Sequence, residues 1–203
     1  MLKLLTMEQK QLHLEVAQDM LDSANSDPEF LNIVTTGDES WVYGYDPETK
    51  VQSSQWKHAT SPRPKKARHA RSNVKAMLTV LFYSRGVVHH KYAPQGQNIN
   101  KEYYLEVLRR FLDAVRHKRP GMWAAGTWQL QYDNAPARSS QLIQTFLAKH
   151  NIFVVRQAPY SPDMAPCDFW LFSHLKTQLK GTRFESRDDI IRNTTAKLHS
   201  IRK

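Results

Sequence analysis

Cysteine and long apolar runs are nearly missing from this 203-residue chain. Its single cysteine is Cys167, so no intrachain disulfide can form, and the chain fits a reducing compartment. No apolar run approaches the ~20 residues that a membrane-spanning helix needs, and the first residues are too briefly apolar for a signal peptide. We therefore expect a cytosolic or nuclear protein that contacts no membrane.

Acidic residues are absent between Glu48 and Glu102, although this interval is rich in lysine and arginine. The whole chain carries 29 Lys and Arg against 19 Asp and Glu, a formal net charge of +10. Phosphate binding needs such charge without internal neutralisation, so nucleic acid is the first candidate partner. The candidate DNA-binding residues are Lys57, Arg63, Lys65, Lys66, Arg68, Arg71 and Lys75. The segment RPKKARHAR is also typical of a nuclear localisation signal, and the alternative is a solvated loop without a partner.

The hydrophobic pattern predicts alternating strands and helices. A capping box at Thr6 and Gln9 starts a helix, and the strand after it ends near Gly37 and Asp38. A polar, proline-bearing loop follows over about 45–72. The remaining expected elements are a hairpin (74–82 with 87–92), a helix capped by Asn100 and ended by Pro120, strands at 127–133 and 152–156, a helix from 139 or 140, and helices beginning near Pro166 and Ser186. This order predicts an α/β fold with a mixed five-stranded sheet flanked by helices, of which the ribonuclease-H-like architecture is one example.

Three aspartates stand at the expected ends of elements. Asp38 ends the first strand, Asp133 ends the strand after the long helix, and Asp168 lies in the first turn of a late helix. Sites in α/β sheets form where strands end, and carboxylate oxygens suit Mg²⁺ or Mn²⁺. Two such ions about 3.5–4 Å apart can activate a water and stabilise a leaving oxygen in phosphodiester cleavage.

Each aspartate also has a purely structural interpretation. Asp38 follows a glycine and Asp133 precedes Asn134, so both suit turns. Asp168 would complement the dipole of its helix. Glu39 is expected to point to the opposite face of the strand from Asp38. Composition and spacing alone therefore do not single out three ligands.

Five segments together resemble the catalytic domain of mariner-type transposases, in the Tc1/mariner superfamily. They are TGDESWVYGYDPETK (36–50), SPRPKKAR (61–68), YDNAPA (132–137), PYSPDMAPCDFWLF (159–172) and LKGTRFES (179–186). The resemblance implies a ribonuclease-H-like fold in which Asp38, Asp133 and Asp168 bind two Mg²⁺ or Mn²⁺ ions. The last two have 34 residues between them, the spacing of the family. The implied activity is cleavage of both DNA strands at transposon ends and joining of the free 3′-hydroxyls to a TA target.

The same resemblance implies an organisation and partners. Residues 1–27 form a linker helix and residues 28–203 the catalytic domain, with the basic loop clamped onto a second subunit and helping to position DNA. We expect double-stranded DNA and a homodimer as partners, a nuclear location and no small-molecule cofactor. The family's two helix-turn-helix modules do not precede the domain in this sequence, so we expect no specific recognition of transposon ends. The alternative is a catalytically inactive, transposase-derived module for DNA binding or dimerisation.

Arg138 departs from the resemblance. Family members commonly have histidine at this position of the motif around Asp133. An arginine puts a fixed positive charge near the expected site, where it would compete with a metal ion or pair with a carboxylate.

Overall fold

Five strands form one mixed sheet in the computed structural model, which describes residues 4–47, 56, 58, 60–62, 69–180 and 182–201. The spatial order is β3-β2-β1-β4-β5. β2 is antiparallel to β1 and β3, whereas β4 is parallel to β1 and β5 is parallel to β4. The strands are β1 (Val34–Pro47), β2 (His69–Tyr83), β3 (Gly86–Tyr92), β4 (Gln129–Gln131) and β5 (Phe153–Val155). The predicted mixed five-stranded sheet is confirmed.

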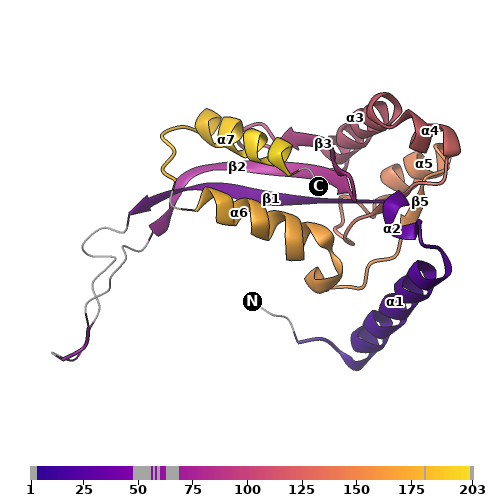
Figure 1. Cartoon of the computed structure of the whole chain (residues 1–203), viewed down its shortest axis with the longest axis horizontal. Helices are drawn as coiled ribbons and strands as arrows, with labels where there is room; N and C mark the ends of the chain where they lie inside the picture. The colour runs from indigo at the N-terminus through magenta and orange to yellow at the C-terminus, as the bar shows by residue number, and fades with distance from the viewer. Residues whose placement is uncertain are drawn as a thin grey trace.

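Helices cover both sides of this sheet. They are α1 (Met7–Ser26), α2 (Phe30–Ile33), α3 (Lys101–Lys118), α4 (Pro120–Ala125), α5 (Gln141–Lys149), the 3₁₀-helix η1 (Pro162–Met164), the π-helix η2 (Cys167–Phe172), α6 (Ser173–Leu179) and α7 (Arg187–Ser200). Figure 1 shows α3, α4 and α5 gathered at the end where β1 begins, and α6 and α7 along the long ribbon of β1 and β2. No helix among the described residues is long and apolar enough to cross a bilayer.

The alternation of side chains along β2 divides the interior into two cores. Leu81 and Tyr83 belong to the first core, whereas Leu78, Val80 and Phe82 belong to the second, as the period of two in a strand requires. The first core is completed mainly by α3, α5 and β4, through Val107, Leu108, Phe111, Leu130, Ile143 and Leu147. The second is completed by η2, α6 and α7, through Cys167, Leu171, Leu175, Leu179, Ile190 and Leu198. The sheet is therefore buried on both faces between two helical layers.

Most of the predicted helix starts are confirmed. Thr6 and Gln9 form a capping box at α1, and the side chains of Asn100 and Ser186 accept hydrogen bonds from backbone N–H groups of α3 and α7. Helix α3 ends at Lys118, just before Pro120, as predicted, and Pro120 also occupies the first turn of the further helix α4. Its fixed φ suits that position, where no intrahelical N–H bond is needed.

The first strand is longer than predicted. β1 continues through Asp38 to Pro47, and Asp38 pairs with Val80 in the middle of the ladder. Gly37 is no turn residue, because a Cβ there would lie 3.0 Å from Leu81 Cγ of the neighbouring strand. The predicted loop over 45–72 is correspondingly shorter, since its two ends pair as strands from Tyr45 opposite Arg71 to Pro47 opposite His69.

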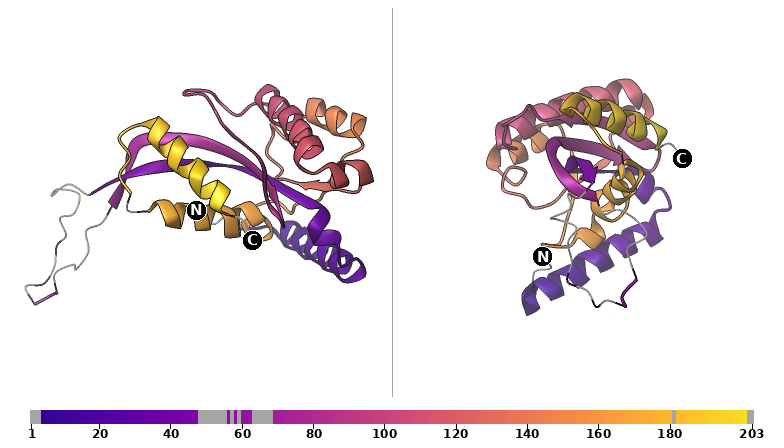
Figure 2. Two further views of the ribbon diagram at one scale, coloured as in Figure 1. Left: turned by 45° about the horizontal axis from the view of Figure 1, so that its top comes forward. Right: turned by 90° about the vertical axis from the view of Figure 1, so that its left-hand side faces the viewer.

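Helix α1 contacts the rest of the domain through His13. Its Nδ1 lies 2.7 Å from Ser161 Oγ, and its Nε2 lies 3.3 Å from Asp163 Oδ2. Figure 2 shows α1 beside the sheet and its covering helices rather than between them. The division of the chain at residue 27 stays a prediction.

Candidate active site

The topology of the sheet brings the three predicted aspartates together. β4 runs parallel to β1 with Gln131 opposite Thr36, so Asp133, two residues beyond β4, follows beside Asp38. Asp168 is the second residue of η2, in its first turn. All three line one small cavity, together with Thr36, Gly37, Gln131, Tyr132, Gln157, Ala165 and Cys167. The structure therefore brings these three side chains together, although Asp38 lies within its strand and not at its end.

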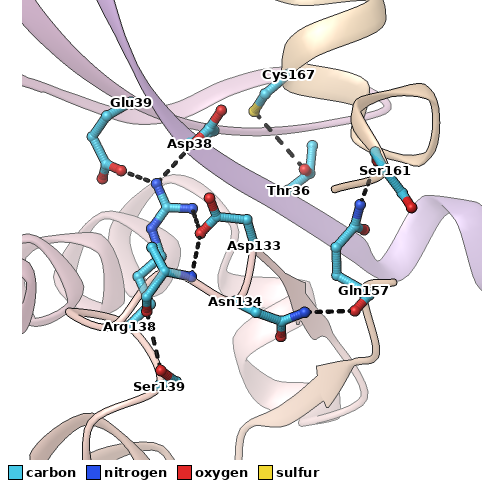
Figure 3. A network of polar contacts seen from close by, with 11 residues as sticks. Thr36, Asp38, Glu39, Asp133, Asn134, Arg138, Ser139, Gln157, Ser161 and Cys167 are labelled. Carbon is cyan, nitrogen blue, oxygen red and sulfur yellow. Dashed lines mark hydrogen bonds and ion pairs between the residues drawn. The ribbon is translucent and has the colours of Figure 1, made fainter. Parts of the chain in front are cut away.

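Arg138 lies between the carboxylates. Its Nη1 donates to Asp133 Oδ1 at 2.6 Å, and its Nη2 donates to Asp38 Oδ1 at 2.7 Å. The same Nη2 also contacts Glu39 Oε2 (Figure 3). The side chains of Arg138 and Asp38 are only 2% and 17% exposed, so their ion pair is shielded from water, whereas Asp133 is 51% exposed. One guanidinium thus bridges three carboxylates from two segments of the chain.

The open edge of β1 explains why Asp38 and Glu39 both reach Arg138. Neighbouring residues of a strand point to opposite faces, as predicted for this pair. However, β4 pairs with β1 only as far as Thr36, so the edge of β1 beyond this point is not covered by a neighbouring strand on that side. A guanidinium at that edge can donate to carboxylates from both faces. The sequence did not predict Glu39 as part of the site.

The turn after β4 holds Arg138 in place. Asp133 Oδ1 accepts a hydrogen bond from the N–H of Ala135 at 3.0 Å, and the N–H of Arg138 donates to the carbonyl of Ala135 at 2.9 Å. Asp133 therefore serves as a turn residue as well as an ion-pair partner. The guanidinium carbon lies 5.5 Å from the ring centre of Tyr104 on α3, which favours a cation–π contact.

Some polar atoms of this cluster remain unpaired among the described residues. Arg138 Nε, Glu39 Oε1 and Tyr104 Oη are buried without a hydrogen-bond partner. A buried donor or acceptor without a partner costs about 1–3 kcal/mol. The carboxylate cluster is therefore not fully satisfied by its own side chains.

Burial raises the pKa of all three aspartates. For Asp38 the loss of hydration is the main cause, and the positive charge of Arg138 opposes it. For Asp133 burial raises the pKa, and the hydrogen bond from Ala135 opposes this effect. For Asp168 burial and then the negative charges of Asp38 and Asp133 raise the pKa, so the three carboxylates interact electrostatically.

Cys167 is not a nucleophile in this site. Its side chain is fully buried, and its Sγ lies 3.8 Å from Thr36 Oγ1. Burial, followed by the charge of Asp38, raises the pKa of the thiol. A neutral buried thiol packs η2 against β1.

A wider cleft of about 580 Å³ opens beside the cluster. Asp133 and Asp168 line it, with Gln9 of α1 and the loop of residues 157–162. Gln157 fixes that loop, because its side chain donates to the carbonyl of Ser161 at 2.8 Å and accepts from Gln131 at 2.9 Å. Asn134 donates to the carbonyl of Gln157 at 2.8 Å (Figure 3). The cleft is thus bounded by hydrogen-bonded segments on the side of the turn after β4.

Most predicted DNA-binding residues lie outside the described residues. This holds for Lys57, Arg63, Lys65, Lys66 and Arg68, while Arg71 is placed only as a member of the β2 backbone. Lys75 is exposed, and its Nζ lies 4.3 Å from the ring centre of Trp41. The DNA contacts of this group stay a prediction.

Comparisons with known proteins agree with this architecture. A family model described as Transposase (partial DDE domain) matches residues 46–125. The Mariner Mos1 transposase of Drosophila mauritiana is 30% identical over 162 residues, which are 79% of this chain and 46% of that protein. The histone-lysine N-methyltransferase SETMAR of Homo sapiens is 28% identical over 188 residues, covering 91% of this chain and 26% of that protein. The chain thus spans less than half the length of these relatives.

Solved structures match nearly the whole chain. The Mos1 mariner paired end complex with Mn superposes with a TM-score of 0.84 at 25% identity, covering 99% of this chain and 58% of that one. The comparisons thus support a mariner-type transposase catalytic domain. The isolated catalytic domain of Mos1 covers 98% of this chain and 85% of its own, with a TM-score of 0.79. The mariner-type domain therefore has the predicted ribonuclease-H-like fold.

The carboxylates of this mariner-type domain suit a hard divalent ion by chemistry but not by arrangement. Oxygen donors are the preferred ligands of Mg²⁺ and Mn²⁺. Here Arg138 holds one oxygen of Asp38 and one of Asp133. Across the ranges that the structure covers, no three His, Cys, Asp or Glu side chains are placed to hold a metal ion together. The guanidinium therefore occupies one oxygen of each of two expected ligands, and the ligand roles stay predictions.

Proposed function

We propose that this domain carries out transposase-type DNA cleavage and strand transfer, with Asp38, Asp133 and Asp168 as its essential carboxylates. The observation that carries the proposal is the meeting of these three residues around one cavity, which joins β1, the turn after β4 and η2. Similarity to the mariner-type family supports the reaction class. The adjoining cleft offers room for a nucleic-acid strand beside Asp133 and Asp168.

The cofactor that we propose is Mg²⁺ or Mn²⁺, two ions per site. Solved Mos1 paired end complexes with Mn and with Mg support the choice of ion. Asp38, Asp133 and Asp168 are the proposed ligands, and they become available together only when Arg138 moves away from Asp38 and Asp133.

The proposed partners are double-stranded DNA and a second copy of the chain. The Mos1 paired end complexes support both, since they contain transposon ends held together. The acid-free interval around Lys57, Arg63, Lys65, Lys66, Arg68, Arg71 and Lys75 is the proposed contact to phosphates and to the partner subunit. Action on DNA makes the nucleus the proposed location.

A second candidate function is DNA binding or dimerisation without catalysis. It is favoured by one observation, the bridging of Asp38, Glu39 and Asp133 by Arg138. In this candidate the carboxylate cluster serves only to stabilise the fold, and the DNA surface is retained.

A plasmid nicking assay separates the two candidates. The purified chain is incubated with supercoiled plasmid and a series of Mg²⁺ or Mn²⁺ concentrations, with Asp133→Ala as the matched control. Metal-dependent nicking that is lost in Asp133→Ala is the expected result. If the folded protein binds DNA but never nicks it with either metal, the second candidate holds instead. Equal nicking by the Asp133→Ala variant would point to a contaminating nuclease.

The salt dependence of DNA binding tests the basic interval. Each phosphate contact contributes roughly −0.9 to the slope of log affinity against log salt for duplex DNA. Replacing Lys65, Lys66 and Arg68 by alanine is expected to reduce the slope by about 2–3. An unchanged slope would remove these residues from the phosphate-contact surface.

A further inference from the structure

We propose that Arg138 is a built-in cation of the carboxylate cluster, so that Mg²⁺ or Mn²⁺ enters only by displacing its guanidinium. The proposal rests on the proposed function for the identity of the metal ion, but the competition it describes is a property of the cluster itself. It assigns to Arg138 the control of metal loading.

The geometry supplies the first argument. Nη1 and Nη2 take Asp133 Oδ1 and Asp38 Oδ1 at 2.6 and 2.7 Å, the distances of short charge-assisted hydrogen bonds. A metal ion shared by Asp38 and Asp133 would have to lie between the same two carboxylates. Guanidinium and metal ion therefore compete for these two Oδ1 atoms.

Burial supplies the second argument. The side chains of Arg138, Asp38 and Glu39 are 2%, 17% and 10% exposed, so the pairs of Arg138 with Asp38 and with Glu39 are not surface contacts weakened by water. The third partner, Asp133, is 51% exposed. Tyr104 lies 5.5 Å below the guanidinium and restricts its movement on the side of α3. Such a group competes with dissolved ions far better than an exposed arginine would.

Charge supplies the third argument. Three carboxylates contact one guanidinium, and Asp168 adds a fourth negative charge at the same cavity. Lys176 offsets part of this charge, because it is close enough to Asp38 to lower the pKa of that carboxyl. The cluster therefore keeps an excess of negative charge, and its unpaired Arg138 Nε and Glu39 Oε1 show that the guanidinium does not satisfy it fully. A divalent ion can thus replace Arg138, at high concentration.

Metal binding to Arg138→His tests the proposal. Histidine removes the fixed charge and the two-pronged contact but keeps a polar ring. The matched control is Arg110→His, which removes an exposed arginine from a pair with Glu106 on α3. Mn²⁺ binding is followed by electron paramagnetic resonance and by the shift of the melting temperature on adding Mn²⁺.

The expected result is a gain in metal affinity confined to Arg138→His. Its dissociation constant for Mn²⁺ should fall at least about tenfold below that of the wild type. Millimolar Mn²⁺ should raise its melting temperature by about 5 °C, and that of the wild type and Arg110→His by less than about 1 °C. A merely structural arginine would lower stability on substitution without creating this metal response.

Several outcomes would overturn the proposal. Equal Mn²⁺ affinity in wild type and Arg138→His would mean that the guanidinium does not compete with the metal ion. No Mn²⁺ binding by either protein would mean that something other than the guanidinium prevents metal binding. If Arg138→His unfolds without metal, recovery of a cooperative melt on adding Mn²⁺ supports the proposal. If it stays unfolded, Mn²⁺ binding is measured with Arg138→Lys instead. The lysine ammonium cannot bridge two carboxylates as the forked guanidinium does, so this variant should bind Mn²⁺ with intermediate affinity.

The nicking assay keeps this proposal separate from the proposed function. Mn²⁺ binding by Arg138→His without nicking by either protein would refute nuclease activity and leave the competition intact. Nicking by wild type and variant at the same half-saturating Mn²⁺ concentration would refute the competition and leave the nuclease intact.

Discussion

The strand side and the helix side of the carboxylate cavity are held in different ways. On the strand side, Asp38 and Asp133 are bound by the buried guanidinium of Arg138. On the helix side, the Asp168 carboxylate has no hydrogen-bond or ion-pair partner among the residues that the structure describes, and its residue is exposed at the start of η2. The three carboxylates thus differ because Asp38 and Asp133 face the turn that carries Arg138, whereas Asp168 does not pair with it. Asp38 and Asp133 therefore form ion pairs that stabilise the fold, whereas the Asp168 carboxylate remains open to a ligand.

The largest effect should come from Arg138→Ala. This change leaves Asp38, Glu39 and Asp133 close together without their shared cation, and breaking a buried ion pair costs about 3–5 kcal/mol. Urea unfolding of the variant and the wild type measures the difference. Arg110→Ala is the control, and its exposed pair with Glu106 is worth less than about 1 kcal/mol. A loss below about 1 kcal/mol in Arg138→Ala would show that the guanidinium is not a structural cation.

A smaller effect should separate Asp38 from Asp168. Asp38→Asn removes a charge-assisted hydrogen bond to Arg138, so we expect a loss of about 2 kcal/mol in the free energy of unfolding. Asp168→Asn removes an unpaired carboxylate whose pKa is raised by burial and by its acidic neighbours, so we expect a change within about 0.5 kcal/mol. Thermal and urea melts of the two variants give the comparison. Equal losses would mean that the two sides of the cavity are held alike.

The smallest expected effect is on the free energy of unfolding at low pH. His89, outside the cavity, contributes to the loss of stability in acid, so its contribution must be known before the two sides of the cavity are compared at low pH. Burial, followed by the charge of His90, lowers the pKa of His89 on β3 to about 4. The folded state therefore keeps His89 neutral while the unfolded state takes up a proton below about pH 6.5, so stability falls as the pH drops from about 6.5 to about 4.

Substitution of His89 measures this contribution. His89→Gln should remove about 1–2 kcal/mol of the acid-induced loss, allowing for partial exposure of the ring. The exposed His150→Gln serves as the control for replacing a histidine at the surface. Unfolding free energies at pH 7 and pH 4.5 provide the test. A parallel profile in His89→Gln and wild type would contradict the assignment.

Much of the fold was predictable from local patterns. The capping residues Thr6, Asn100 and Ser186 mark helix starts because they satisfy backbone N–H groups within their own segments. The extent of β1 was not predictable from its own residues, because Gly37 and Asp38 favour a turn in isolation. Pairing of Gly37 with Leu81 holds the strand extended through them, and a Cβ at Gly37 would lie only 3.0 Å from Leu81 Cγ.

The sequence by itself pointed to Asp38, Asp133 and Asp168 as residues of one site only through the resemblance of its motifs to the mariner family. It also determined that a fixed charge, Arg138, lies near Asp133. Only the tertiary structure decided that this charge binds Asp38, a residue 100 positions away, and also draws in Glu39. The reason is physical: the parallel pairing of β4 with β1 stops at Thr36, and the uncovered edge beyond it admits one buried guanidinium to carboxylates from both faces of the strand.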